Sequence, residues 1–241
     1  MRRSSSISRG TAIPILMYHH VVARPPRGTP SRYLFVEPRR FRAQMRLLKL
    51  LGYRGCSMAE LAPHLRGEAS GKVVGITFDD GFRNVYDHAL PVLEECGFTA
   101  TTYFVSRQVN GHNAWDTGFL PQMPCMTKAE LRDWQARGQE VGAHTLDHER
   151  LAALPIAAAE RQIAGSKAEL EDMIGRPVEA FSYPYGSFSE AVVEMARGSG
   201  FTTGTTTLSG KATATHDPLR LPRMTVGGSD GYLRFLGRKI F

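Results

Sequence analysis

The sequence predicts an α/β fold in which helices surround a largely parallel sheet or barrel. Its 241 residues are a length that such barrels fill as one domain. Short apolar runs of strand length alternate with helical patterns along the chain. Polar residues follow several of these runs, as expected where a site is built at the carboxyl ends of parallel strands. We therefore expect one domain over residues 12–241, preceded by a flexible basic tail over residues 1–11.

Eight apolar runs are the expected strands. They cover residues 13–18, 53–56, 73–78, 99–105, 140–143, 180–183, 201–205 and 219–226. Between them, two stretches have the apolar spacing of helices that pack one face on a core; their apolar residues are Phe41, Met45, Leu48 and Leu51 in the first and Val85, Ala89, Val92 and Leu93 in the second.

Capping signals predict where other helices begin and end. Ser57 and Thr127 each lie three residues before a glutamate, which is the capping-box spacing. Five glycines should end helices in the left-handed conformation, namely Gly52, Gly97, Gly138, Gly175 and Gly200.

Composition narrows the classes of partner. Thirty basic and 23 acidic residues give a net charge of +7. The bases are spread along the chain, apart from Arg2 and Arg3 and a cluster at Arg39, Arg40, Arg42 and Arg46, so we expect no nucleic-acid partner. No apolar run long enough for a signal peptide or a membrane span is visible, which favours a cytoplasmic chain unless a leader is missing. The basic, amphipathic residues 232–239 favour a packed terminal helix over contact with an anionic lipid.

Three segments at predicted strand ends carry the residues of a site. Asp79 and Asp80 follow the run 73–78, where alternation would give the two carboxylates different tasks; the alternative is that one of them caps the next helix. His144 and His148, four residues apart on one side of a helical turn, are spaced to bind one metal ion, although surface or core histidines are about as common.

The third segment, residues 182–186, contains Pro184, Tyr185 and Gly186. Its turn could present the backbone amide of Tyr185 to a developing oxyanion, and the alternative is an aromatic turn packed on the core. One aspartate and two histidines form a three-ligand site that leaves positions open for water and substrate, as hydrolytic metal centres require.

Residues 77–81, 144–148 and 182–186, in that order, resemble the three main motifs of the polysaccharide deacetylases, the NodB-homology carbohydrate esterases of family 4. With the flanking strands and helices, the resemblance covers residues 12–226. It implies a distorted (β/α)7 barrel and one divalent metal ion, most often Zn²⁺, with Co²⁺ or Ni²⁺ as alternatives. It also implies the removal of acetyl groups from an N-acetylated glycan.

The resemblance assigns roles to individual residues. Asp80, His144 and His148 correspond to the metal ligands, Asp79 to the general base, and Pro184 and Tyr185 to the oxyanion and substrate-binding segment. Ser182 stands where many members have an arginine that orients the base. Arg223, in a late Pro-Arg pair on the last predicted strand, is the candidate to replace it.

The general acid is the least determined role. Residues 17–21 resemble the N-terminal Tyr-His segment of the deacetylases that act on poly-N-acetylglucosamine, which favours His19. His20 and His216 are the alternatives, although His20 should point to the opposite face of the strand.

Two kinds of function are alternatives to N-deacetylation. One is deformylation or O-acetyl ester hydrolysis of a sugar or glycolipid by the same residues. The other is an inactive, carbohydrate-binding relative, which is disfavoured because ligands, base and an acid candidate are all present.

Overall fold

The structure is a computed structural model that describes residues 12–116, 118 and 121–241. The expected basic tail, residues 1–11, lies outside the described residues. None of the helices in the described ranges combines the length and the apolar character needed to cross a membrane.

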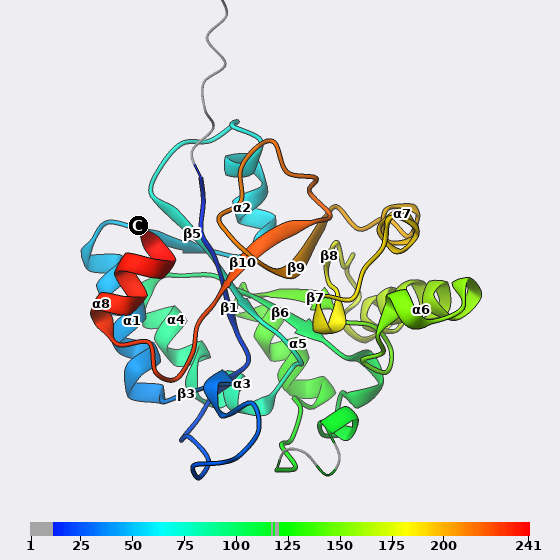
Figure 1. Ribbon diagram of the computed structural model, residues 1–241, viewed down its shortest axis with the longest axis horizontal. Coiled ribbons are helices and arrows are strands. Elements are labelled where there is room, and N and C mark those ends of the chain that lie inside the picture. Colours follow the sequence, from blue (N-terminus) through cyan, green and yellow to red (C-terminus); the bar gives the residue numbers. More distant parts are fainter. Residues whose placement is uncertain (1–11, 117, 119–120) are drawn as a thin grey trace, which may run out of the picture.

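A barrel of parallel strands forms the centre of the molecule (Figure 1). Within the described residues, seven strands form its ring, and the pairing of β1 with β5 closes it. In ring order they are β1 (Ile15–Tyr18), β10 (Leu221–Thr225), β9 (Thr203–Ser209), β8 (Ala180–Ser182), β7 (Glu140–Ala143), β6 (Thr101–Phe104) and β5 (Val73–Phe78). The expectation of a distorted (β/α)7 barrel is confirmed.

The distortion lies next to β5. β4 (Arg54–Cys56) pairs with the first half of β5, from Val73 to Gly75, and β6 pairs with its last two residues. The same edge of β5 therefore serves two strands in succession. β2 (His20–Val21) and β3 (Phe35–Val36) form a separate parallel pair, which the sequence patterns did not reveal.

Helices surround the barrel (Figure 1). They are α1 (Pro38–Leu50), α2 (Met58–Leu65), α3 (Arg83–His88), α4 (Leu90–Cys96), α5 (Lys128–Ala136), α6 (Ile156–Ile174), α7 (Glu190–Gly198) and α8 (Tyr232–Phe235). The capping predictions are confirmed: the Ser57 hydroxyl accepts a hydrogen bond from the Glu60 amide, and Thr127 and Glu130 form a complete capping box. All five glycines predicted to end helices have positive φ.

One helix prediction is wrong. The apolar stripe that begins at Val85 suggests a single helix, but the chain forms α3 and α4, which meet at Ala89. Pro91 lies in the first turn of α4, where its missing amide costs nothing, whereas inside a longer helix its ring would clash with the preceding turn. The apolar spacing continues across the break, so it does not reveal the break.

The terminal segment packs as expected. Phe235 and Ile240 are buried, while Leu233 remains exposed. The three cysteines, Cys56, Cys96 and Cys125, are buried free thiols, in agreement with the absence of any disulfide spacing.

Candidate active site

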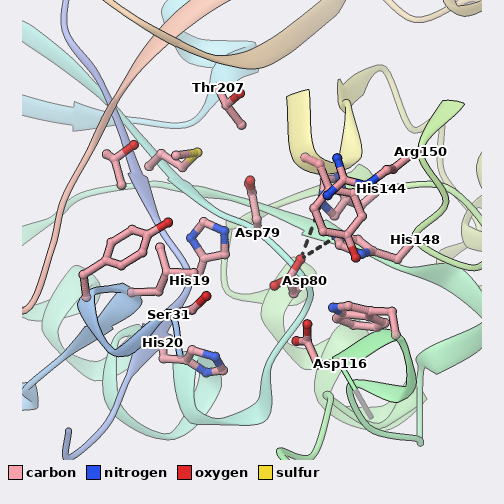
Figure 2. A pocket seen from close by; sticks show the side chains of 16 residues that line it. His19, His20, Ser31, Asp79, Asp80, Asp116, His144, His148, Arg150 and Thr207 are labelled. Atoms are coloured by element: carbon pink, nitrogen blue, oxygen red, sulfur yellow. Dashed lines mark ion pairs between the residues drawn. The ribbon is translucent and has the colours of Figure 1, made fainter. Parts of the chain in front are cut away.

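A pocket of about 480 Å³ opens at the carboxyl ends of the barrel strands. Six of the seven ring strands contribute polar residues to the lining of the pocket, from the strand itself or from the segment after it. These residues are His19 after β1, Asp79 and Asp80 after β5, His144 and His148 after β7, Tyr185 after β8, Thr207 in β9 and Thr225 at the end of β10. Figure 2 shows the two aspartates between His19 on one side and His144 and His148 on the opposite side.

Asp80, His144 and His148 form a compact, buried group. Their ligand atoms all lie within 4.8 Å of one another, so the three residues could hold a metal ion. Oδ1 of Asp80 lies 3.5 Å from Nε2 of His144 and 3.4 Å from Nε2 of His148 (Figure 2).

The surroundings of His144 fit the role of a metal ligand. Its Nδ1 lies 2.7 Å from the carbonyl oxygen of Ser182, which can only accept, so Nδ1 carries the proton. In the neutral imidazole, Nε2 then presents a lone pair to the Asp80 carboxylate, whose Oδ1 is buried with no hydrogen-bond donor in the described part of the chain. Two acceptors that face each other are stable when a cation lies between them, and this donor set suits Zn²⁺.

Burial favours the protonation state that a histidine ligand requires. Burial lowers the pKa of His148 by more than the Asp80 carboxylate raises it. His148 is therefore neutral near pH 7, as metal ligation demands.

The path of the chain through residues 144–148 differs from the expectation. No helical turn forms there, and Thr145 and His148 have positive φ. These residues form a tight turn, in which the His148 amide donates a 2.9 Å hydrogen bond to the Thr145 hydroxyl. The two imidazoles are brought together by this turn and not by helical periodicity.

Backbone strain is concentrated around the pocket. In the described ranges, six non-glycine residues have positive φ, and five of them belong to the pocket or its motifs: Ser31, Asp80, Thr145, His148 and Tyr185. Each such conformation costs on the order of 1–3 kcal/mol. The surrounding fold must supply this energy, and strain of this kind is typical of functional sites.

Asp79 is buried and is held by Arg223, which is itself completely buried. The guanidinium donates from Nη1 to Oδ1 at 2.6 Å and from Nη2 to Oδ2 at 2.7 Å. Burial would raise the pKa of Asp79, but the charge and hydrogen bonds of Arg223 lower it below its ordinary value. Asp79 is thus a fixed, ionised carboxylate beside the Asp80–histidine group. Neither aspartate caps α3, whose first turn follows Phe82 without a side-chain cap.

Ser182 contributes to both halves of the site. Its hydroxyl accepts a 3.0 Å hydrogen bond from Nη2 of Arg223, and its carbonyl accepts from His144. Arg223 completes its hydrogen bonds with Thr77 and the carbonyl of Thr206. The small residue at position 182 and the arginine on β10 are therefore in direct contact.

The three candidate acids differ in their surroundings. His19 lines the pocket, and its Nδ1 has no partner in the described part of the chain. His20 stacks on Phe35 at 4.1 Å and on Phe82 at 3.9 Å, and burial lowers its pKa to about 3. His216 is exposed and lies among residues that precede β9 and β10, at the other end of the barrel.

Tyr185 lies in the turn after β8 with a φ of 58°. The amides of Gly186 and Ser187 close this turn on the carbonyls of Tyr183 and Pro184, and the Tyr185 amide takes no part in those bonds. A Cβ at Gly186 would collide with the Thr207 hydroxyl, so this glycine lets the turn approach β9. The Tyr185 ring lines the pocket and is not packed in the core.

Sequence reasoning missed several pocket residues. Trp115, whose ring lies 4.6 Å from that of His148, and Asp116 come from the long connection between β6 and α5. Arg150 lies over the Tyr185 ring at 4.0 Å. These residues do not follow a strand end directly, so their positions gave no signal.

A parallel barrel with carboxylates and imidazoles in a pocket at the carboxyl ends of its strands has the architecture of a barrel enzyme. The family model of the polysaccharide deacetylases matches residues 66–204, more than half of the chain, and the chain belongs to this family.

Individual relatives agree with this assignment. The Bacillus subtilis protein YxkH, which is named for this family, is 29% identical over 216 residues, which cover 89% of this chain and 71% of YxkH. The poly-β-1,6-N-acetyl-D-glucosamine N-deacetylase of Staphylococcus epidermidis is 23% identical over 195 residues, 79% of this chain and 68% of that protein. The Streptococcus pyogenes deacetylase PplD, solved with acetate, superimposes with a TM-score of 0.84 at 24% identity, covering 95% of this chain and 99% of that one.

Proposed function

We propose that the protein is a metal-dependent hydrolase that removes N-acetyl groups from a glycan. The observation that carries the proposal is the buried group of Asp80, His144 and His148, whose ligand atoms lie within 4.8 Å of one another, with the buried Asp79 adjacent in sequence. Asp80, His144 and His148 are the proposed metal ligands. When bound, a divalent cation supplies Lewis acidity and lowers the pKa of a water molecule.

Asp79 is the proposed general base. Its carboxylate is ionised, fixed by two hydrogen bonds from Arg223 and adjacent in sequence to a proposed ligand, so it can accept a proton from the attacking water. The backbone amide of Tyr185 is the proposed donor to the oxyanion that forms when the acetamide carbonyl is attacked. His19 is the proposed acid that protonates the departing amine.

The substrate class rests on the family and on the relatives. The Staphylococcus epidermidis relative is named for a β-1,6-linked N-acetylglucosamine polymer, and we propose the same class of acyl group here. Trp115 and Tyr185 offer aromatic faces of the kind that pack against sugar rings. Glycans of exopolysaccharide, lipopolysaccharide or peptidoglycan type would present the same N-acetyl group.

A screen of acyl groups tests this proposal. Oligosaccharides that carry N-acetyl, N-formyl or O-acetyl groups are incubated with the enzyme, with and without chelator, and the released acid is measured. We expect acetate from the N-acetylated oligomer, and we expect chelator to abolish its release. Preferential release of formate would indicate a deformylase, and release only from the O-acetyl ester would indicate an esterase. Binding without release of any acid would indicate an inactive relative.

Arg223 is proposed as a positioning residue for Asp79. Arg223→Ala leaves the Asp79 carboxylate buried and unpaired, which costs about 3–5 kcal/mol of stability. Because the charge and hydrogen bonds of Arg223 no longer oppose the effect of burial on the pKa of Asp79, that pKa should rise, and the acidic limb of the pH–rate profile should move to higher pH. Arg223→Lys keeps the charge but loses the bidentate contact. The acidic limb of its pH–rate profile should lie between those of the unmodified enzyme and Arg223→Ala. An unchanged profile in a folded Arg223→Ala variant would contradict this role.

The proposed role of His19 as the general acid can be tested by comparing substrates with different leaving groups. His19→Gln should lower kcat on an N-acetylated oligosaccharide by about 10²-fold, the lower range for loss of a general acid. The loss should be much smaller on 4-nitrophenyl acetate, whose leaving group departs without a proton. His20→Gln is the matched control and should mainly lower the melting temperature, because His20 packs between two phenylalanines. Equal losses on both substrates would exclude His19 as the acid.

A further inference from the structure

A cluster of four arginines lies beside the active-site pocket and has no role in the chemistry proposed above. We name it the arginine cluster; its members are Arg24 and Arg32, from the connection between β2 and β3, and Arg39 and Arg40, from the first turn of α1. Arg39 and Arg40 line a separate cavity of about 310 Å³, together with Glu37, Gln44, Asp230 and Tyr232.

The members of the arginine cluster lack the ion pairs that other arginines make. Arg42 and Arg46, one turn further along α1, both contact the Glu95 carboxylate. In the described part of the chain, no member of the cluster has a carboxylate within 4.0 Å of its guanidinium. Glu37 is directed to the Arg24 backbone amide, at 3.1 Å. Asp230 already faces Arg234 and Lys239, at 3.7 and 3.9 Å.

The fold keeps these like charges together. Arg24 lies against Gly228, where a Cβ would come within 2.7 Å of its Nε, and Arg32 donates from Nε to the carbonyl of Pro25 at 2.6 Å. Nε of both Arg24 and Arg40 is buried with no hydrogen-bond partner in the described residues. Burial, and then the charges of Arg32 and Arg40, lower the pKa of Arg24 by more than the charge of Glu37 raises it. Arg39 and Arg40 also lie at the positive end of the α1 dipole. An anion bound among these groups would relieve all of these costs.

The position of the cluster connects it to the active site. Ser31 and Tyr33 line the active-site pocket, and Arg32 lies between them in sequence. Arg24, Arg32 and Arg40 are half-buried, and the cavity that Arg40 lines is recessed. A recess suits a small oxyanion on a flexible polymer better than the flat surface of a bilayer.

We propose that the arginine cluster binds a carboxylate or phosphate group carried by the glycan substrate, on a sugar outside the active-site pocket. The proposal rests on the function proposed above and adds to it that the glycan is acidic. Arg guanidinium groups match the planar, two-oxygen geometry of such anions.

Binding of sugars that carry no acyl group tests this inference separately from hydrolysis. Hexagalacturonate and the neutral cellohexaose are titrated into the metal-loaded full chain by calorimetry. We expect the acidic hexamer to bind at least about tenfold more tightly, the order expected from charge-assisted hydrogen bonds, and the difference to shrink as salt is added. The acidic hexamer should also inhibit acetate release more strongly than the neutral one.

Two variants and one control complete the test. Arg39→Gln/Arg40→Gln, which removes positive charge from the start of α1 and so should not impair folding, is expected to abolish the preference for the acidic hexamer. Arg24→Gln should reduce it. Arg161→Gln/Arg176→Gln removes two exposed arginines elsewhere and should preserve it.

Three outcomes would overturn the inference. They are equal binding of both hexamers to the unmodified chain, an equal loss in the control variant, and arginine-dependent binding to vesicles of anionic lipid without binding of the acidic hexamer. If the acidic hexamer binds as expected but no N-acetylated substrate releases acetate, the proposed reaction fails while the anion site stands.

Discussion

Asp79→Asn is expected to lower kcat for deacetylation by about 10²–10⁴-fold, the range attributed to loss of a general base. The asparagine keeps the shape of the side chain, and its amide oxygen can still accept a hydrogen bond from Arg223, but it cannot take a proton from water. Metal binding should persist, because Asp79 is not among the proposed ligands. Acetate release and metal content, measured on the same preparation, give both values.

The control for this variant separates chemistry from folding. Asp79→Asn leaves the buried charge of Arg223 without its carboxylate partner, so its melting temperature should fall. Ser182→Ala removes a neutral partner of the same guanidinium and should keep most of the activity. Turnover near the unmodified level in Asp79→Asn would exclude Asp79 as the base.

His144→Ala is expected to abolish both metal binding and deacetylation. The imidazole supplies one of three proposed ligand atoms, and its Nδ1 bond to Ser182 orients the ring. Residual activity should equal that of the unmodified enzyme in chelator. His216→Ala, which removes an exposed histidine far from the pocket, is the matched control and should retain metal and turnover. Stoichiometric metal in His144→Ala would contradict the ligand assignment.

The parts of the fold that the sequence predicted best are the strands that lead into the site. The bounds of β5 and β7 agree with the apolar runs. Each run is followed at once by a polar site residue, Asp79 after β5 and His144 after β7, which marks the end of the strand. The helix after β5 was predicted less well, since apolar spacing persists through the break at Ala89. β9 runs on to Ser209, beyond its apolar stretch, and so brings Thr207 to the pocket.

The site was predictable where its residues follow a strand directly. Asp79, Asp80 and His144 do so, His148 and Tyr185 lie a few residues further along the same segments, and parallel strands bring their carboxyl ends to one face. The contact between Arg223 and Asp79 joins residues 144 positions apart, and only the family resemblance suggested it. Trp115, Asp116 and Arg150 reach the pocket through loops whose paths depend on tertiary packing, which no local pattern encodes.

The central claim is that one metal ion, held by Asp80, His144 and His148, is required for glycan N-deacetylation. Its most direct test is to remove metal with chelator, titrate Zn²⁺ back, and follow acetate release from an N-acetylglucosamine oligomer together with bound metal. The account predicts no acetate from the metal-free chain and activity that saturates at one ion per chain. Undiminished acetate release from the metal-free chain would contradict it.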